Sequence, residues 1–170
     1  MKLKFNTTAE KYVKLLNYNF VVDTFQLPEA LNTCIHSNII EKYDYIGLEE
    51  VFDNFEDKNS EIEKTLVECK SNVIFIENYL DNDKYSNEYN FLKFGIKTGE
   101  KLAERFSNEN KSEKIKIIVV FNKSLVNKEQ KLNKFASCSV RFYKDRTGDN
   151  ILFKRDINDY KDFAIIEIDL

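Results

Sequence analysis

The chain has 170 residues, of which 42% are hydrophobic, 14% aromatic and 32% charged, and its formal net charge is -3 at pH 7. This composition excludes a disordered chain, and the length fits a single domain over residues 1–170. The acidic balance argues against general binding of nucleic acid, and the absence of a long apolar run or a signal peptide argues against a membrane span, so we expect a cytoplasmic protein.

Helical spacing marks the beginning of the chain. Thr7 and Glu10 form a capping-box pattern, which predicts a first helix over residues 8–17. The aromatic and β-branched residues 18–25 fit either a strand or a loop that feeds the next helix, and both alternatives stay open. Pro28 fits the first turn of a second helix.

The second helix is expected to end near residues 37–38. From residue 46 to residue 69 the apolar residues again follow a helical period, with a break at residues 57–59. Ser60 and Glu63 supply a capping box after the break. The pattern therefore predicts two helices in this region rather than one.

A short strand and a long helix are expected next. Residues 72–80 contain several β-branched residues and favour a strand over a helical extension. The period of residues 88–107 predicts a helix whose apolar stripe includes Gly95 and Gly99. Each interior glycine costs about 1 kcal/mol relative to alanine, so the pair indicates a close approach of another backbone, supplied by a sheet packed across this helix.

Strands dominate the last third of the chain. Residues 114–122, 135–143 and 163–170 read as strands, and a turn at 147–150 leads into a further short strand at 151–153. Helices therefore come first and the strands last, which predicts an α+β fold with N-terminal helices packed on a C-terminal, mostly antiparallel sheet.

Candidate catalytic residues are few. His36 is the single histidine, which excludes zinc sites that need two or more imidazoles. Cys34 lies two residues before it, and residues two apart on a helix point in different directions, so a nucleophile–base pair is disfavoured. The segment 95–101 lacks the phosphate-loop pattern. We expect no catalytic residue, no metal site and no cofactor.

Acidic residues concentrate in the middle of the chain. Between residues 49 and 68, eight acids stand against two lysines, a local balance of -6. This run is typical of either the solvated face of helices, a docking surface for a basic protein, or a divalent-metal site. The candidate partner-binding residues are Glu49, Asp53, Glu56, Asp57, Glu61, Asp81 and Asp83.

Arginines concentrate near the C-terminus. Arg141, Arg146 and Arg155 could bind a phosphate or a carboxylate. Pairing with the nearby acids is the favoured interpretation, and these acids are Asp145, Asp149 and Asp156.

The second half of the chain resembles a known class of proteins. The runs FGIKTGEKLAERF, KIKIIVV, SCSVRFYKDRTGDN and DINDYKDFAIIEID are similar to the small cytosolic immunity proteins of bacterial polymorphic and contact-dependent growth inhibition toxin systems. The resemblance covers roughly the last 80 residues. It implies a protein without catalysis of its own that binds and neutralises a cognate toxin domain, and it assigns no binding residue.

Two other functions stay open. The acids between residues 49 and 83 could serve a metal-dependent hydrolase or nuclease of unfamiliar type, and the chain could also be a regulatory or adaptor domain of a mobile element. If the partner is a nuclease toxin, it must be basic around its substrate cleft, and an acidic surface on the inhibitor would speed association. We therefore expect a basic protein partner, no nucleic acid and no membrane.

Overall fold

The computed structural model describes residues 2–20, 24–52, 60–80, 89–109, 111, 114–123, 137–146 and 156–170. The strands within these ranges are β1 (Lys2–Phe5), β2 (Ile39–Lys42), β3 (Tyr45–Leu48), β4 (Val73–Phe75), β5 (Ile115–Asn122), β6 (Ser137–Lys144) and β7 (Phe163–Asp169). The helices are α1 (Thr7–Leu15), α2 (Glu29–His36), α3 (Glu61–Ser71) and α4 (Tyr89–Asn108), with short 3-10 helices η1 (Ile76–Tyr79) and η2 (Ile157–Asp159).

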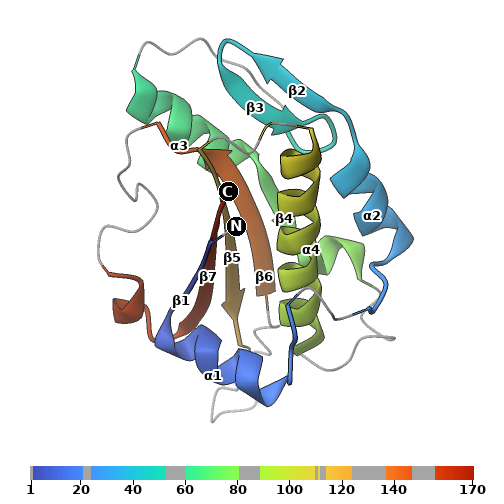
Figure 1. Ribbon diagram of the computed structural model, residues 1–170, viewed down its shortest axis with the longest axis vertical. Coiled ribbons are helices and arrows are strands. Elements are labelled where there is room, and N and C mark those ends of the chain that lie inside the picture. Colours follow the sequence, from blue (N-terminus) through green and yellow to red (C-terminus); the bar gives the residue numbers. More distant parts are fainter. Residues whose placement is uncertain are drawn as a thin grey trace, which may run out of the picture.

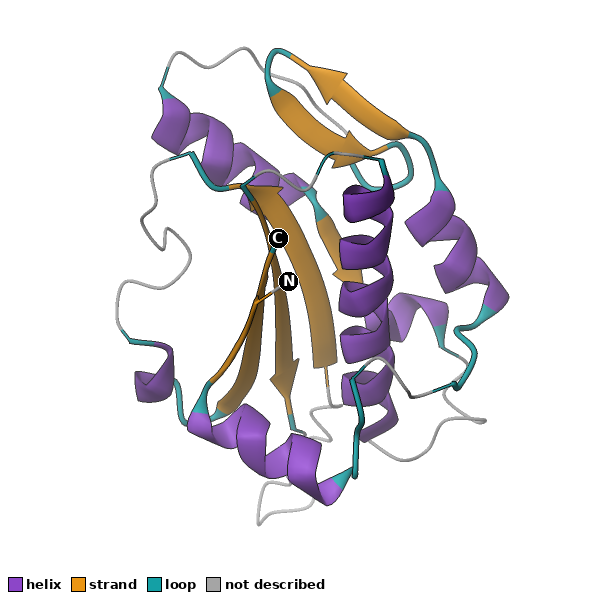
Figure 2. Cartoon of the chain, viewed as in Figure 1, coloured by secondary structure: helices purple, strands orange, loops and turns teal. Residues whose placement is uncertain are grey.

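The described strands form two sheets. The larger sheet has the order β1-β7-β5-β6-β4 with every neighbouring pair antiparallel, and β2 and β3 form a separate hairpin. Helix α4 crosses one face of the larger sheet, α2 lies beside α4, and the hairpin lies at the opposite end of the molecule from α1 (Figure 1). The fold is α+β with helices packed on an antiparallel sheet, as the sequence predicts (Figure 2).

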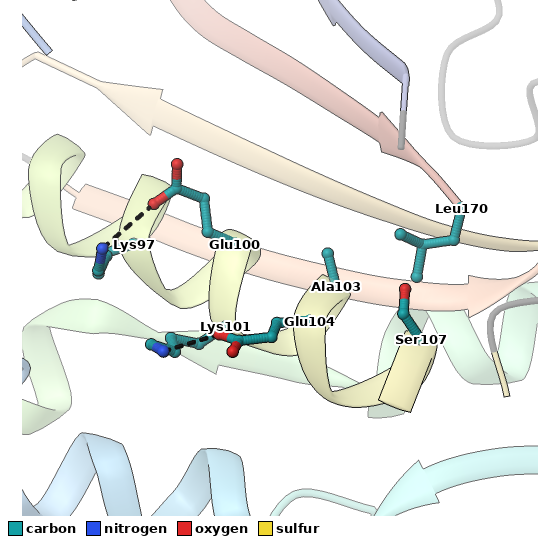
Figure 3. Close-up of a pocket in the computed structure, with 7 residues that line it drawn as sticks. All are labelled: Lys97, Glu100, Lys101, Ala103, Glu104, Ser107 and Leu170. Atoms are coloured by element: carbon teal, nitrogen blue, oxygen red, sulfur yellow. Dashed lines mark hydrogen bonds and ion pairs between the residues drawn. The ribbon is translucent and has the colours of Figure 1, made fainter. Parts of the chain in front are cut away.

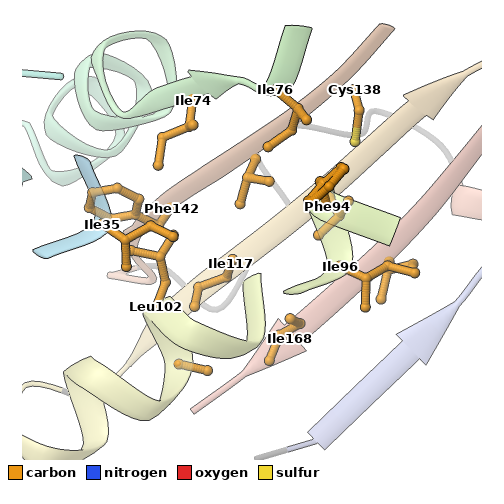
Figure 4. Close-up of a cluster of buried hydrophobic side chains, with 14 of the residues drawn as sticks. Ile35, Ile74, Ile76, Phe94, Ile96, Leu102, Ile117, Cys138, Phe142 and Ile168 are labelled. Atoms are coloured by element: carbon orange, nitrogen blue, oxygen red, sulfur yellow. The ribbon is translucent and has the colours of Figure 1, made fainter. Parts of the chain in front are cut away.

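Strand β5 lies at the centre of the larger sheet, which explains why its sequence is apolar on both faces. Ile117 and Val119 lie on the face toward α4, where they join the main core together with Phe142 of β6 (Figure 4). Ile118 has the opposite orientation and belongs to a second buried cluster with Tyr143. Because strand side chains alternate, a strand at the middle of a sheet with both faces covered has to be apolar at nearly every position.

The glycine stripe of α4 lies where the helix touches the sheet. A Cβ atom added at Gly95 would stand 2.3 Å from Cys138 Sγ and 3.2 Å from Val119 Cγ1. A Cβ atom added at Gly99 would stand 3.0 Å from Ile168 Cδ1 and 3.2 Å from Val119 Cγ2. The predicted packing of a sheet against the two glycines is therefore confirmed, but the atoms that approach them belong to side chains of β5, β6 and β7 rather than to a backbone.

The prediction of a helix that begins at residue 46 is wrong, because β3 occupies residues 45–48 and forms a hairpin with β2. The chain reverses at Tyr43 and Asp44, whose φ angles are 53° and 69°. A two-residue turn with both φ angles positive matches the twist of a hairpin and usually contains Asn or Gly, so the sequence gives no ordinary turn signal. The apolar residues Ile46 and Leu48 fit a helical period but are buried from a strand.

Other local predictions have mixed outcomes. The capping box at Ser60 is confirmed, since its hydroxyl accepts a hydrogen bond from Glu63 N at 3.1 Å. The cap of α1 is Asn6 rather than Thr7, because the Asn6 side chain accepts from Ala9 N at 2.8 Å. Strand β1 was not predicted, and residues 72–80 contain strand β4 followed by η1. The predicted turn and strand at 147–153 lie outside the described residues.

Replacement of Gly99 by leucine should lower the free energy of unfolding by about 1 to 3 kcal/mol, because the new side chain has to displace Ile168 and Val119. The measurement is a denaturant titration. Ser107→Leu on the exposed side of the same helix is the control and should change stability by less than about 0.5 kcal/mol. A melting midpoint unchanged by Gly99→Leu would contradict the packing.

Candidate functional site

The structure describes two of the predicted partner-binding residues. Glu49 is exposed at the open end of the hairpin, where its carboxylate accepts a hydrogen bond from the Asn38 side chain at 2.7 Å. Glu61 is exposed at the first turn of α3. The other five lie outside the described residues, namely Asp53, Glu56, Asp57, Asp81 and Asp83.

Glu68 belonged to the same acidic run in the sequence but is fully buried. Its Oε1 accepts hydrogen bonds from Ile46 N at 2.7 Å and from Arg146 Nη2 at 3.0 Å. Its Oε2 accepts from Lys144 N at 2.8 Å and from Arg146 Nη1 at 2.8 Å. The carboxylate therefore joins α3, β3 and the end of β6, and it is not part of the acidic surface.

The Arg146 guanidinium connects the buried Glu68 carboxylate to two acids at the surface. Its Nε lies 3.2 Å from a carboxylate oxygen of Asp44 and 3.2 Å from one of Glu61. Its Nη2 donates to the backbone carbonyl of Asp44. The arginine side chain is 6% exposed, whereas those of Asp44 and Glu61 are 51% and 55% exposed. One buried cation therefore holds two surface acids from different elements close together.

Asp44 stays ionised because of these contacts. Its partial burial acts to raise the pKa, but hydrogen bonds and charge from Lys144 and Arg146 outweigh that effect and hold the pKa below its ordinary value. Lys144 Nζ lies 2.8 Å from Asp44 Oδ1. Asp44 is therefore a carboxylate at neutral pH, and it is ion-paired with Lys144 and Arg146.

Large apolar side chains are exposed beside the two acids. Tyr43 precedes Asp44 in the turn and is 51% exposed, and Ile62 follows Glu61 and is 55% exposed. The ammonium of Lys42 lies 5.1 Å from the centroid of the Tyr43 ring. A bulky residue rarely adopts a positive φ, and such strain persists only where the surrounding structure enforces it, often at functional sites. We call Tyr43, Asp44, Glu61, Ile62 and Glu63 the hairpin–α3 surface.

The expected pairing of arginines with aspartates close in sequence is wrong for the described residues. Asp145 instead lies 2.9 Å from the ammonium of Lys116, and Asp156 caps η2. Arg141 donates to the carbonyl oxygen of Cys69 at 2.7 Å. Sequence reasoning missed these partners because the arginines contact α3 and the hairpin turn, which are distant in sequence. Arg155 and Asp149 lie outside the described residues.

The cysteines are poor nucleophiles. Burial raises the pKa of Cys34 and raises that of Cys69 to about 12, and it raises the pKa of Cys138 well above the ordinary value. The Cys34 sulfur accepts a hydrogen bond from the Tyr79 hydroxyl at 3.4 Å, while His36 Nδ1 lies 2.8 Å from a backbone carbonyl of its own helix. Cys34 and His36 therefore make separate contacts, in line with the interpretation of the sequence.

Grooves of about 430 and 800 Å³ flank α4. The smaller one is lined by α4 and Leu170, and the larger one reaches α2 and the segment before it. Figure 3 shows that lysines and glutamates in the smaller groove pair with each other; Lys97 Nζ lies 3.6 Å from Glu100, and Lys101 Nζ lies 2.7 Å from Glu104. These charges stabilise α4 and leave the hairpin–α3 surface as the stronger candidate.

The described residues contain neither a cluster of metal-binding side chains nor a membrane-spanning helix. Among them, no three His, Cys, Asp or Glu side chains gather so that they could hold a metal ion. None of the described helices is long and apolar enough to cross a membrane.

Replacement of Arg146 by methionine should destabilise the protein by about 3 to 5 kcal/mol, because it leaves the Glu68 carboxylate buried without its cation. The double variant Arg146→Met and Glu68→Met should recover most of the loss, since removing both charges of a buried pair is often neutral. Chemical denaturation of the two single variants and the double variant measures this coupling. Additive losses would contradict the role of the pair.

Comparison with known proteins finds a match at the level of a family model. No curated protein and no solved structure matches the chain. The match is to a family model that covers almost the whole sequence, including α1, the hairpin, α4 and, apart from the first two residues of β1, the strands of the larger sheet. With residues 4–170 matched, the chain belongs to the uncharacterized protein PM0498 family.

Proposed function

We propose that the chain is a non-catalytic immunity protein that binds a cognate toxin domain and neutralises it through the hairpin–α3 surface. The observation that carries the proposal is the hairpin turn, where Tyr43 is half exposed at a positive φ beside the exposed carboxylate of Asp44. Arg146 donates hydrogen bonds to the carboxylate and to the backbone carbonyl of Asp44 and so fixes the turn. Rigid aromatic side chains surrounded by polar groups are the usual anchors of protein interfaces.

The charge of the exposed residues favours a basic partner. Glu49, Asp44, Glu61 and Glu63 are all exposed at the hairpin and the start of α3. A toxin that cleaves nucleic acid needs a basic cleft to hold phosphates. Acidic groups on the inhibitor would steer such a toxin and fix its orientation. The resemblance of the C-terminal half to immunity proteins supports the same partner class.

The reactive groups of the described residues support binding rather than catalysis. The Arg146 guanidinium and the Glu68 carboxylate use their hydrogen-bonding capacity on each other and on the backbone. The cysteine thiols have raised pKa values and are buried. Because these charged groups and thiols stabilise the fold, the described surface is better suited to binding a partner than to catalysis.

The proposal predicts that the gene immediately upstream encodes a toxin, and it is tested by co-expression of this chain with the toxin domain of that gene product. Cells that make both proteins should grow, whereas cells that make the toxin domain alone should not, and the two purified proteins should form a complex. Growth arrest in the presence of this chain would overturn the proposal. Metal-dependent cleavage of RNA or DNA by the chain itself would favour the alternative of a hydrolase.

Reversal of Glu49, Glu50 and Glu63 to lysine should slow association with the toxin domain by about tenfold or more at low ionic strength and by less at high salt, because salt screens exposed charges. Glu61 is left unchanged because it contacts Arg146. Stopped-flow or surface-based kinetics measures the rate.

The matched control reverses Glu10, Asp159 and Asp162, which are exposed and lie near α1, far from the hairpin (Figure 1). It changes the net charge by the same amount and should slow association much less. Equal effects of the two triple variants would mean that only net charge matters and that the surface is placed wrongly.

Tyr43→Asn should separate stability from binding. Asparagine tolerates a positive φ, so the variant should be as stable as the wild type or more stable by about 1 kcal/mol. Loss of the aromatic anchor should raise the dissociation rate of the toxin domain by about tenfold or more. Thermal melting and dissociation kinetics check the two effects. A variant that unfolds more easily yet binds normally would contradict both expectations.

A further inference from the structure

The hairpin has two edges that differ in their hydrogen bonding. Lys42 pairs with Tyr45 around the two-residue turn, Ile40 pairs with Gly47, and Glu49 N donates to Asn38 O at 2.9 Å. In an antiparallel ladder, pairs that exchange hydrogen bonds alternate with pairs whose N–H and C=O groups point away from each other. Every second residue of each hairpin strand therefore turns its backbone groups outward.

The outer edge of β3 is closed by side chains. Ile46 is an outward-facing residue, and its N–H donates to Glu68 Oε1 at 2.7 Å. Its carbonyl oxygen accepts a hydrogen bond from Asn72 Nδ2 at 2.8 Å. Both partners belong to α3 or to the residue that ends it. Side chains therefore satisfy at β3 the groups that a third strand would otherwise bind.

The outer edge of β2 has no such closure. The same alternation turns the N–H and C=O groups of Ile39 and Glu41 outward, and in the described part of the chain no hydrogen bond to these backbone groups occurs. The side chains of Ile39 and Ile40 are half buried, so the strand already has apolar surface on both sides. Figure 1 shows β2 as the outer strand of the hairpin. An unpaired edge of this kind is a template for another strand.

We propose that the partner adds an extended strand to the free edge of β2, so that the hairpin becomes part of a three-stranded sheet in the complex. This inference rests on the proposed function and names its mode of binding. Main-chain hydrogen bonds to Ile39 and Glu41 supply affinity, and side chains set specificity.

The charges around this edge identify the kind of strand that fits. Glu41 lies on the edge strand itself, where its 41% exposed side chain forms an ion pair with Lys111 at 2.9 Å, so the remaining exposed acids lie at the two ends of the edge. Asp44 follows β2 in the turn and is 51% exposed, and the exposed Glu49 stands at the other end of the hairpin. Acids at both ends of the free edge fit a strand that carries lysine or arginine. The edge is also continuous with the hairpin–α3 surface through Tyr43.

Glu41→Pro tests the edge directly. The Glu41 N–H points away from β3, so proline removes the donor offered to the partner without breaking the hairpin ladder. Glu41→Ala is the matched control, since it removes the same carboxylate and keeps the N–H. Glu41→Pro should weaken binding of the upstream-encoded toxin domain by about tenfold or more relative to Glu41→Ala. Circular dichroism and melting should show that both variants are folded.

Hydrogen exchange supplies the second measurement. In the free protein the amide of Glu41 should exchange much faster than that of Ile40, which donates within the hairpin. Addition of the toxin domain should protect the Glu41 amide. Equal binding by the proline and alanine variants, or no added protection, would overturn the edge inference while leaving the proposed function intact. No binding by the wild type would overturn the proposed function, and a dimer of this chain that Glu41→Pro dissociates would assign the edge to a second copy.

Discussion

The buried carboxylate of Glu68 is the constraint on which the arrangement of the hairpin depends. A charge removed from water costs several kcal/mol unless hydrogen bonds and an opposite charge replace its hydration. Glu68 obtains four donors, from Ile46 of β3, from Lys144 of β6 and twice from Arg146. None of these donors is close to it in sequence, so α3, β3 and the end of β6 satisfy the carboxylate only when all three are in place.

Two buried asparagines also hydrogen-bond elements that are distant from them in sequence. Asn6 caps α1, and its side chain also accepts from Ile165 N at 3.0 Å and donates to Phe163 O at 2.8 Å, which ties the helix to β7. Asn72 ends α3 and donates to Ile46 O at 2.8 Å and Phe142 O at 3.2 Å. A chain with four glycines and one proline has few of the usual turn residues, and buried amides take over part of their role by bonding backbone groups where elements meet.

Elements with a strong local period could be predicted from the sequence, and elements determined by distant contacts could not. Helix α4 and strand β5 carry their burial pattern within their own residues, so periodicity was sufficient. The hairpin was missed because its turn contains Tyr43 and Asp44 where a glycine is usual, and because Arg146 stabilises it from 102 residues away. Glu68 was counted as a surface acid for the same reason, since its cation lies 78 residues further along the chain.

The hairpin is also where local preference and final structure disagree most. In α4 and β5, by contrast, sequence period, burial and packing agree, as expected where local choices support the fold. In the hairpin, side chains of Glu68 and Asn72 hydrogen-bond the outer backbone groups of β3 but not those of β2. The turn has positive φ angles at two residues other than glycine. Isolated two-stranded hairpins have marginal stability, so the bonds from Glu68, Asn72 and Arg146 are needed to keep this one in place. The hydrogen bonds from these three residues act on β3 and on the turn, and within the described residues they leave the outward backbone groups of β2 unbonded.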